Sequence, residues 1–270
     1  MPLISLISAS NELPTANEGL EALWDRFLIR YYVKNIENVE LFNKMITDTA
    51  DIYEVNIPDG DKITPEMYKT FQKDIKAIKV DNMVLCSIHE IRVKLQEDLG
   101  ITISDRRWKK IIKLLKTSAF MNNRNCVDLM DAFLIKHCIW NNETEIEQTE
   151  KIVREVVGGY GYTYDIKIND LIEELKRIKA EINKELKKSK DIHPHLKEHL
   201  AEKIQRLDEK ISDSIHMVQE YLESDLGSLK NNMFIYDNYV PLVTTGIQDT
   251  ISELEEMQME LDKKRDELGV

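Results

Sequence analysis

The sequence predicts a mainly α-helical protein. Glycine occurs 9 times and proline 6 times among 270 residues, so few positions interrupt a helix. Charged residues make up 32% of the chain, which is typical of long helices with solvated faces. From residue 64 onward, apolar residues recur mostly every three or four positions, and this is the period of an amphipathic helix.

The first apolar stretch departs from this helical pattern. Residues 3–14 read LISLISASNELP, an apolar run that ends at small and turn-forming residues. Such a run predicts a buried parallel strand, and the edges of that strand require partner strands. We expect a helix over 18–30, capped within 15–17, and a shorter helix over 38–46. The turn residues of 53–64 predict a loop or a small hairpin.

Four further helices follow in close succession. Thr64 is a suitable N-cap for the first, with Pro65 at its first helical position, and Gly100 ends the second. Ser104 or Asp105 can cap the third. Because the joins are short, the four helices should form a compact bundle. Their expected ranges are 64–80, 82–100, 104–122 and 127–140.

The last part of the chain predicts long charged helices. Two of them, over 166–190 and 195–223, carry a narrow apolar seam, and the short joint between them predicts an antiparallel hairpin. A final helix over 247–268 could add a third helix to the seam. Before these, a helix over 143–157 ends at a break rich in glycine and tyrosine, 158–165. The stretch 233–243 predicts two short strands or an extended crossing.

The composition excludes several classes of protein. With 37 Lys and Arg against 49 Asp and Glu, the net charge of −12 argues against nucleic-acid and anionic-membrane partners. No apolar stretch approaches the roughly 20 residues that span a bilayer, and no basic leader begins the chain. The 3 cysteines lack CxxC spacing. His195 and His199 stand four positions apart, a spacing that can bind a metal ion on one helix face, but a solvated polar hinge explains them better. We therefore expect a cytoplasmic protein without a bound metal.

Three polar stretches hold the candidate functional residues. Asn11 follows the apolar run, where it could hold a water or a phosphate, or form a helix-entry turn. Arg26 could stabilise phosphoryl charge on a neighbouring molecule, or pair at the surface with Asp25. Arg106 and Arg107 lie in the first turn of a helix, where cations oppose the helix dipole unless a phosphate or a nearby acid compensates.

Taken together, these stretches carry a family resemblance. Over residues 3–140 the chain resembles the second half of an AAA+ ATPase module of the MoxR group, in its RavA-like branch. The resemblance assigns sensor 1 to Asn11 and the arginine finger to Arg26. It assigns sensor 2 to Arg106, with Arg107 as the alternative. The matching stretches are SASNELP at 8–14, EALWDRFLIR at 21–30 and SDRRWKKIIKLLKTSAFMNNRNCVDLMD at 104–131.

The resemblance also implies an organisation for the chain. Residues 1–35 would be the remnant of an α/β AAA+ core, 36–140 a helical lid domain, and 141–270 a charged, coiled-coil-like tail. The parent module would bind ATP and Mg²⁺ and hydrolyse ATP to remodel or mature partner proteins. Its partners would be neighbouring ATPase subunits, in a ring that the resemblance implies to be a hexamer, and an unknown client.

One departure from the family pattern limits this expectation. The phosphate loop GxxxxGK[ST] and the acidic strand that holds Mg²⁺ are absent from the sequence. We therefore expect this chain alone to bind ATP weakly and to be inactive. The alternative from a different class is a non-enzymatic helical module that binds other proteins.

Overall fold

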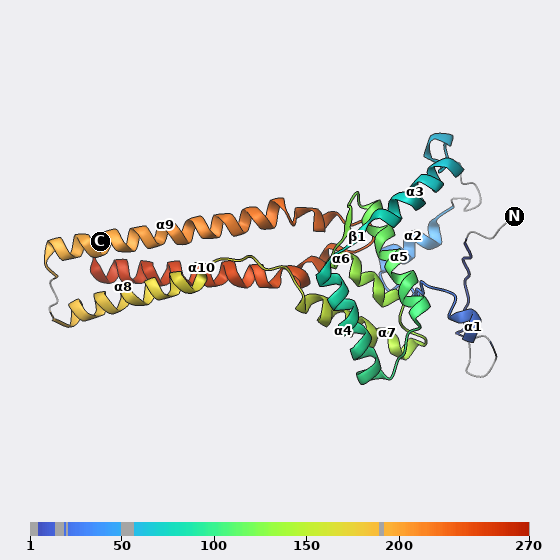
Figure 1. Ribbon diagram of the computed structural model, residues 1–270, viewed down its shortest axis with the longest axis horizontal. Helices are drawn as coiled ribbons and strands as arrows, with labels where there is room; N and C mark the ends of the chain where they lie inside the picture. The colour runs from blue at the N-terminus through green and yellow to red at the C-terminus, as the bar shows by residue number, and fades with distance from the viewer. Residues whose placement is uncertain (1–4, 14–18, 20, 50–56, 189–191, 270) are drawn as a thin grey trace. The chain divides into compact units, whose positions relative to one another are not determined.

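The computed structural model describes residues 5–13, 19, 21–49, 57–188 and 192–269. Within these ranges helices predominate, so the mainly α fold class is confirmed (Figure 1). The chain divides into two compact units, Met1–Val153 and Arg154–Val270. None of the helices in the described ranges combines the length and the apolar composition that crossing a bilayer requires.

The start of the chain differs from its prediction. Ser5–Ser10 is irregular and the Ile7 side chain is 93% exposed, so the described part of the expected strand is not a strand. A parallel strand needs a neighbouring edge, and no described strand pairs with this segment. The helix expected over 18–30 is also wrong beyond Trp24, since α1 spans only Glu21–Trp24. The caps expected at 15–17 lie outside the described residues.

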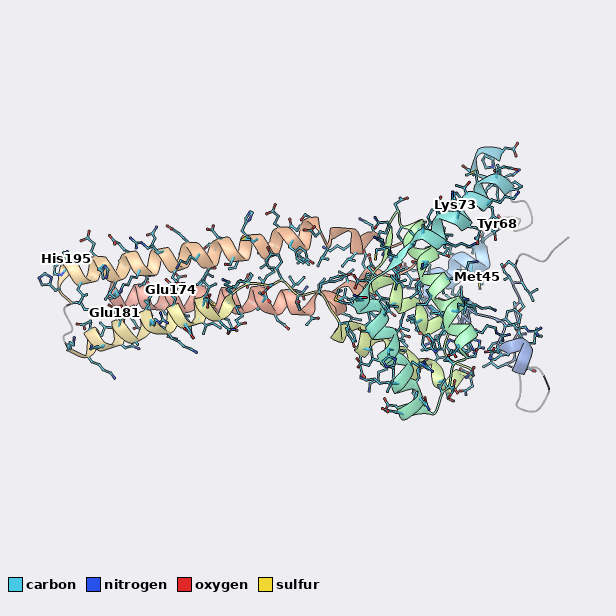
Figure 2. All side chains as sticks on the ribbon, in the orientation of Figure 1. Met45, Tyr68, Lys73, Glu174, Glu181 and His195 are labelled. Atoms are coloured by element: carbon cyan, nitrogen blue, oxygen red, sulfur yellow. The ribbon has the colours of Figure 1, made fainter. Side chains whose placement is uncertain are left out.

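Helix α2, Val39–Thr47, forms as predicted. The Asn38 side chain accepts a 3.0 Å hydrogen bond from the Leu41 amide and so caps the helix. No residue of α2 is buried, and Met45 on its surface is labelled in Figure 2. In the loop predicted over 53–64, the described part contains a short 3-10 helix η1, Asp59–Asp61.

Three helices of the first unit match their predicted ranges closely. They begin at side-chain caps supplied by Thr64, Asp81 and Ser104. The second ends at Gly100, which adopts a left-handed conformation with φ of 66°. Helix α3 packs against α5, and both α4 and α5 pack against the segment after β2. The side chains of Ile91, Ile111 and Leu115 are fully buried. The helices are α3 (Pro65–Ala77), α4 (Asn82–Leu99) and α5 (Asp105–Met121).

A small parallel sheet joins distant parts of this bundle. Strand β1, Lys79–Val80, pairs with β2, Cys126–Val127, in the register Lys79↔Cys126 and Val80↔Val127. The predicted helix over 127–140 is shorter than expected. Helix α6, Leu129–Ala132, starts at a capping box, and the 3-10 helix η2, Phe133–His137, follows it.

A buried polar network fixes the start of α6. The Asp131 carboxylate is fully buried and accepts a 2.6 Å hydrogen bond from the Ser118 hydroxyl. The Arg124 guanidinium donates to both Asp131 oxygens, at 2.8 and 2.7 Å, and pairs with Asp128 at 2.5 Å. Helix α5 and the segment after β2 are therefore joined by charged hydrogen bonds as well as by apolar packing.

The second unit is built around a three-helix bundle, as the seam pattern predicts. Ion pairs Lys203–Glu181 and Lys210–Glu174 show that α8 and α9 run antiparallel, and both glutamates are labelled in Figure 2. Helices α8, α9 and α10 pack against one another along their length (Figure 1). Their bounds are α8 Ile168–Lys188, α9 Pro194–Ser224 and α10 Val240–Leu268.

The seam residues of these helices form the core of the bundle, as expected. Each of the three helices contributes apolar side chains to the buried set. The buried side chains of the seam are Leu171, Leu175, Ile178, Ile182, Leu200, Ile204, Leu207, Ile211, Val218, Ile247, Leu254, Met257 and Leu261.

The connections of the second unit include one correction. The strands predicted over 233–243 do not form, because two 3-10 helices, η3 (Gly227–Asn231) and η4 (Asp237–Tyr239), lead directly into α10. Pro241 lies in the first turn of α10, where its missing N–H and fixed φ suit a helix start. The predicted break after α7 (Glu143–Gly159) is confirmed at residues 160–167.

Glycine allows this break to approach α10 closely. A Cβ atom on Gly161 would lie 2.8 Å from the Val243 carbonyl oxygen. The neighbouring Tyr162 amide donates a 2.6 Å hydrogen bond to that same oxygen. The backbone of residues 160–162 is thus held against the first turn of α10 at a distance that only glycine permits.

Candidate functional site

The segment Trp24–Arg30 is attached to α5 by a carboxylate. The Asp25 side chain accepts a 2.8 Å hydrogen bond from Arg106 and lies 3.4 Å from Arg107. Arg106 is 61% exposed at its side chain, whereas Arg107 is 3% exposed. Asp25 therefore supplies the negative charge that two cations at the start of a helix require. The carboxylate of Asp105, which lies in the same helical turn, is 3.9 Å from Arg92.

A second arginine attaches the other end of the segment. The Arg30 guanidinium donates to the Trp140 carbonyl, to Asn141 Oδ1 at 2.9 Å, and back to the Trp24 carbonyl at 3.0 Å. The Arg30 amide donates to the His137 carbonyl at 2.8 Å. Arg30 is 3% exposed, so these bonds are at least partly shielded from water and hold the segment against η2 and the residues after it.

Aromatic rings complete the cluster around Arg30. The guanidinium carbon lies 4.4 Å from the centre of the Trp24 ring, in a cation–π contact. Trp24 in turn meets Trp140 edge-on, with ring centres 6.2 Å apart. The third tryptophan of the chain, Trp108, follows Arg107 directly in α5. Tryptophan fluorescence is consequently a direct reporter of this region.

Burial dominates the electrostatics of the cluster. Burial, and next the neighbouring Arg107, lower the pKa of Arg30 to about 9, against the smaller opposing effect of Asp25. Burial also lowers the pKa of Arg107, with Asp25 opposing it. The Cys138 thiol beside them has its pKa raised to about 12 by burial. This thiol is therefore protonated and unreactive at neutral pH.

The cluster is rich in donors that lack acceptors. Among the described residues, the buried side-chain atoms without a hydrogen-bond partner all come from four residues of this region. They are Trp24 Nε1, Arg30 Nε, Arg107 Nε and Nη2, and Trp108 Nε1. Of the two buried guanidinium groups, Arg107 pairs with the Asp25 carboxylate, whereas Arg30 donates to neutral oxygens of Trp24, Trp140 and Asn141. Further acceptors would be stabilising here.

The structure brings together some of the predicted site residues and not others. Arg106 and Arg107 meet at Asp25, while Arg26 follows α1 and is exposed. Asn11 is exposed in the irregular first segment. Within the described ranges, no hydrogen bond or ion pair joins Asn11 or Arg26 to either arginine of α5.

Sequence reasoning missed two residues of the site. The sequence offers Asp25 as a surface partner of Arg26, but in the structure it pairs with Arg106 and Arg107. The sequence predicts that Arg30 ends a helix, but α1 ends at Trp24 and Arg30 is buried in the irregular segment that follows. The available signal was its position, because an arginine that closes an apolar segment needs carbonyl or carboxylate partners if that segment is packed.

The residues present fit one side of a nucleotide site. Arg106 is exposed enough to meet a phosphate, whereas Arg107 is covered. No group of three or more His, Cys, Asp or Glu side chains in the described ranges could hold a metal ion. The phosphate loop is also absent from the sequence. Of the two arginines at the start of α5, Arg106 is therefore the one that a phosphate could reach.

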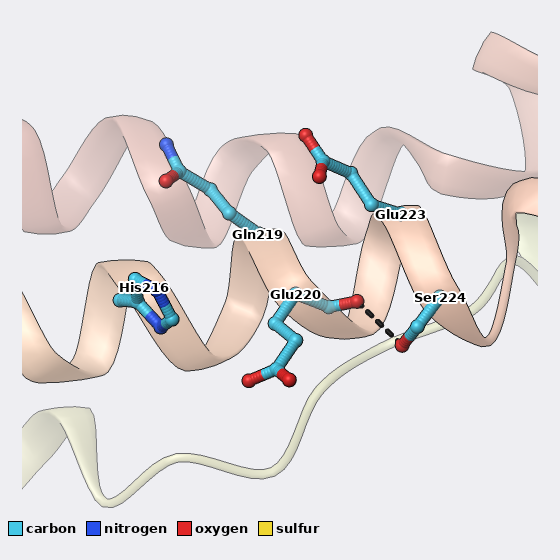
Figure 3. Close-up of a pocket in the computed structure, with 5 residues that line it drawn as sticks. All are labelled: His216, Gln219, Glu220, Glu223 and Ser224. Carbon is cyan, nitrogen blue, oxygen red and sulfur yellow. Dashed lines mark hydrogen bonds between the residues drawn. The ribbon is translucent and has the colours of Figure 1, made fainter.

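A hollow on α9 does not change this conclusion. It measures about 460 Å³ and is lined by His216, Gln219, Glu220, Glu223 and Ser224 (Figure 3). The Ser224 hydroxyl donates to the Glu220 carbonyl at 2.6 Å across one turn of the helix. With two carboxylates and no lysine or arginine in its lining, the hollow does not suit a phosphate.

Two family models match consecutive parts of the chain. Residues 1–73 match the MoxR domain in the MoxR-vWA-beta-propeller ternary systems. Residues 83–153 match the AAA lid domain. Asn11 and Arg26 lie in the first match, and Arg106 and Arg107 in the second. Together the two matches cover more than half of the chain.

Two curated relatives come from Methanocaldococcus jannaschii. The uncharacterized protein MJ0812 is 32% identical over 181 residues, which are 66% of this chain and 46% of the relative. The uncharacterized protein MJ0079 is 30% identical over 182 residues, which are 67% of this chain and 45% of the relative. The chain therefore spans about half the length of these relatives. On the two family matches, the chain belongs to the MoxR-type AAA+ ATPases and contains the carboxyl-terminal part of the module.

Proposed function

We propose that this chain is the sensor and lid part of an ATPase that remodels or matures partner proteins. The proposal rests on the two family matches and on Asp25, which ties the segment bearing Arg26 to Arg106 and Arg107 of the lid helix. In the complete module, ATP with Mg²⁺ would supply the bond that is hydrolysed. This chain alone would bind neither tightly, and we place it in the cytoplasm.

Each candidate residue has a proposed role in that module. Asn11 would help to position the attacking water, as sensor 1. Arg26 would act as the arginine finger on the nucleotide of the next subunit, which agrees with its exposure. Arg106 would act as sensor 2, and its exposure favours it over the buried Arg107.

The proposed organisation follows the family. Residues 1–35 would belong to the core, 36–140 to the lid, and 141–270 to a tail whose long charged helices offer an interaction surface. The partners would be neighbouring ATPase subunits in a ring, which we propose to be a hexamer, and a client protein. The family description supports a vWA-domain protein and a β-propeller protein as further partners.

The test restores the missing half of the module. A phosphate-loop half from a relative is joined to this chain, and ATP binding and turnover are measured separately. Arg26→Ala should lower turnover by about a thousandfold or more while ATP affinity stays unchanged, because the finger stabilises charge only in the transition state. Lys34→Ala, which removes another exposed cation, is the matched control. Unchanged turnover in Arg26→Ala contradicts the proposal.

A second candidate function is a non-enzymatic interaction module. The observation that favours it is α2, whose apolar side chains Leu41, Phe42, Met45 and Ile46 are all exposed. Titration calorimetry of the isolated chain with ATP and Mg²⁺ tests the interaction module. Micromolar binding by this chain would contradict the interaction module, and it would also contradict our expectation that the nucleotide needs the missing half.

A further inference from the structure

The segment that bears Arg26 is held by the lid at both of its ends. We propose that Asp25 and Arg30 are positioning residues that fix Arg26 on the lid, so that the finger and sensor 2 move as one body. The inference rests on the proposed role of Arg26 as the arginine finger. It goes beyond that role because it concerns how Arg26 is held in place, and it adds Arg30 to the contacts made by Asp25.

The first attachment lies directly beside Arg26. Asp25 is its neighbour in the chain, and the Asp25 carboxylate bonds Arg106 at 2.8 Å and approaches Arg107 to 3.4 Å. The Arg26 amide also donates to the Leu23 carbonyl at 3.0 Å, which closes a turn at the end of α1. The backbone of Arg26 is thereby fixed relative to the first turn of α5, while its side chain is exposed.

The second attachment lies four residues further along the chain. Arg30 bonds Trp140 and Asn141 with its side chain and His137 with its backbone amide. It also returns to the Trp24 carbonyl at 3.0 Å, which draws the two ends of the segment together. A segment closed on itself in this way cannot shift Arg26 without breaking buried hydrogen bonds.

The chemistry of the attachment makes it all-or-none. Releasing the segment would separate the buried Arg107 from the Asp25 carboxylate, and it would expose the Trp24 ring. A buried charge that loses its partner is strongly unfavourable. The segment should therefore be docked or released as a unit, with few intermediate positions.

The Asp25 carboxylate links Arg106 to the segment that bears Arg26, and this link gives the attachment a functional consequence. Arg106, the proposed sensor 2, is also the closer of the two partners of Asp25. An interaction that draws Arg106 away from Asp25 removes one of the bonds that fix Arg26. A change at the nucleotide of one subunit is thus transmitted through Asp25 to the finger that serves the next subunit.

The test measures docking in this chain directly. The reporter is hydrogen exchange of the Arg30 amide, which is bonded to His137, together with tryptophan fluorescence. Asp25→Asn should speed exchange of that amide about tenfold and shift the emission to the red, since the carboxylate charge is lost. Arg106→Gln should give a smaller change of about threefold in the same direction. Lys110→Gln, an exposed cation one turn further along α5, should change neither reading.

Hydrogen exchange of the Arg30 amide decides the inference, and turnover in the completed module is an additional reading. Exchange within about twofold of wild type in Asp25→Asn overturns it. Should that variant unfold the lid, seen as lost helical circular dichroism, Arg106→Gln decides alone, and unchanged exchange there also overturns it. In the completed module, Asp25→Asn should lower turnover about tenfold at unchanged ATP affinity. If Arg26→Ala leaves turnover intact, the proposed finger role fails while the docking result still stands.

Discussion

The Asp25 carboxylate accepts a hydrogen bond from Arg106, which lies 81 positions further along the chain. Asp25 belongs to the stretch that matches a MoxR domain, and Arg106 belongs to the stretch that matches an AAA lid. The contact therefore joins two family regions within one compact unit. The segment around Asp25 is accordingly tied to α5 by a charged hydrogen bond.

Arg30 should contribute far more to stability than Arg26. Arg30→Ala removes three side-chain hydrogen bonds and leaves the Trp140 and Trp24 carbonyls without their donor, so we expect a loss of about 2–4 kcal/mol. Arg26→Ala changes an exposed side chain and should cost less than about 0.5 kcal/mol. Urea unfolding followed by tryptophan fluorescence compares the two. Equal losses would contradict the attachment of the segment.

Asp128 should make the stability of the lid depend on pH. Burial, and next the neighbouring Asp131, raise the pKa of Asp128 to about 6, despite the opposing charge of Arg124. Because the folded pKa exceeds the unfolded value of about 4, its contribution is complete below pH 4 and is lost as the pH rises through about 6. Relative to wild type, Asp128→Asn should gain about 2 kcal/mol of stability between these pH values.

The contribution of Asp128 is measured as the difference in stability between wild type and Asp128→Asn at each pH. Asn can still accept the capping bonds from Met130 and Asp131, so the substitution chiefly removes the charge. Unfolding midpoints of wild type and Asp128→Asn are measured across pH 4–8. Parallel curves, with a constant gap between the two proteins, would rule out the raised pKa.

Two neighbouring glycines should respond differently to alanine. In Gly161→Ala the new Cβ would lie 2.8 Å from the Val243 oxygen and 3.0 Å from the Gly158 oxygen, both backbone atoms. We expect a loss of about 1–3 kcal/mol and a lower melting temperature. Gly159→Ala meets nothing within 4 Å and should be almost neutral. A melting temperature that is the same in both variants would refute the close contact with α10.

The three cysteines should react with a thiol reagent at different rates. Cys86 is exposed and should react first. Cys126 is half-buried, and burial raises its pKa, so it should follow more slowly. Cys138, buried and with its pKa raised to about 12, should react only after denaturation. Cys86→Ser identifies the first phase, and rapid reaction of three thiols in the native protein would show that the lid core is open.

The sequence predicted most of the helices but not the small sheet. Helices α3, α4, α5, α8 and α9 follow from the period of their apolar residues and from local caps. Strands β1 and β2 have two residues each, so neither shows the alternation that marks a strand. The sequence predicts helix through residue 30, but the structure has none after Trp24. There the chain is irregular because Arg30 bonds the His137 and Trp140 carbonyls, which lie far away in the sequence.

The sequence predicted the two arginines of the candidate site, Arg106 and Arg107, but it did not identify Asp25 as their partner. Two arginines in a first helical turn imply an anion nearby, and the structure supplies Asp25. Local spacing cannot identify that partner, because it lies 81 positions away. Asn11 remains a prediction from the family resemblance, since its described surroundings hold none of the other candidates.

The most direct test of the account is a mixing experiment with the completed module. One protein carries Arg26→Ala, and the other has an intact Arg26 but a disabled phosphate loop, so neither should hydrolyse ATP alone. If Arg26 acts on the nucleotide of the adjacent subunit, mixed assemblies should recover turnover, because an intact site then meets an intact finger. A mixture no more active than its two components would contradict action across a subunit boundary.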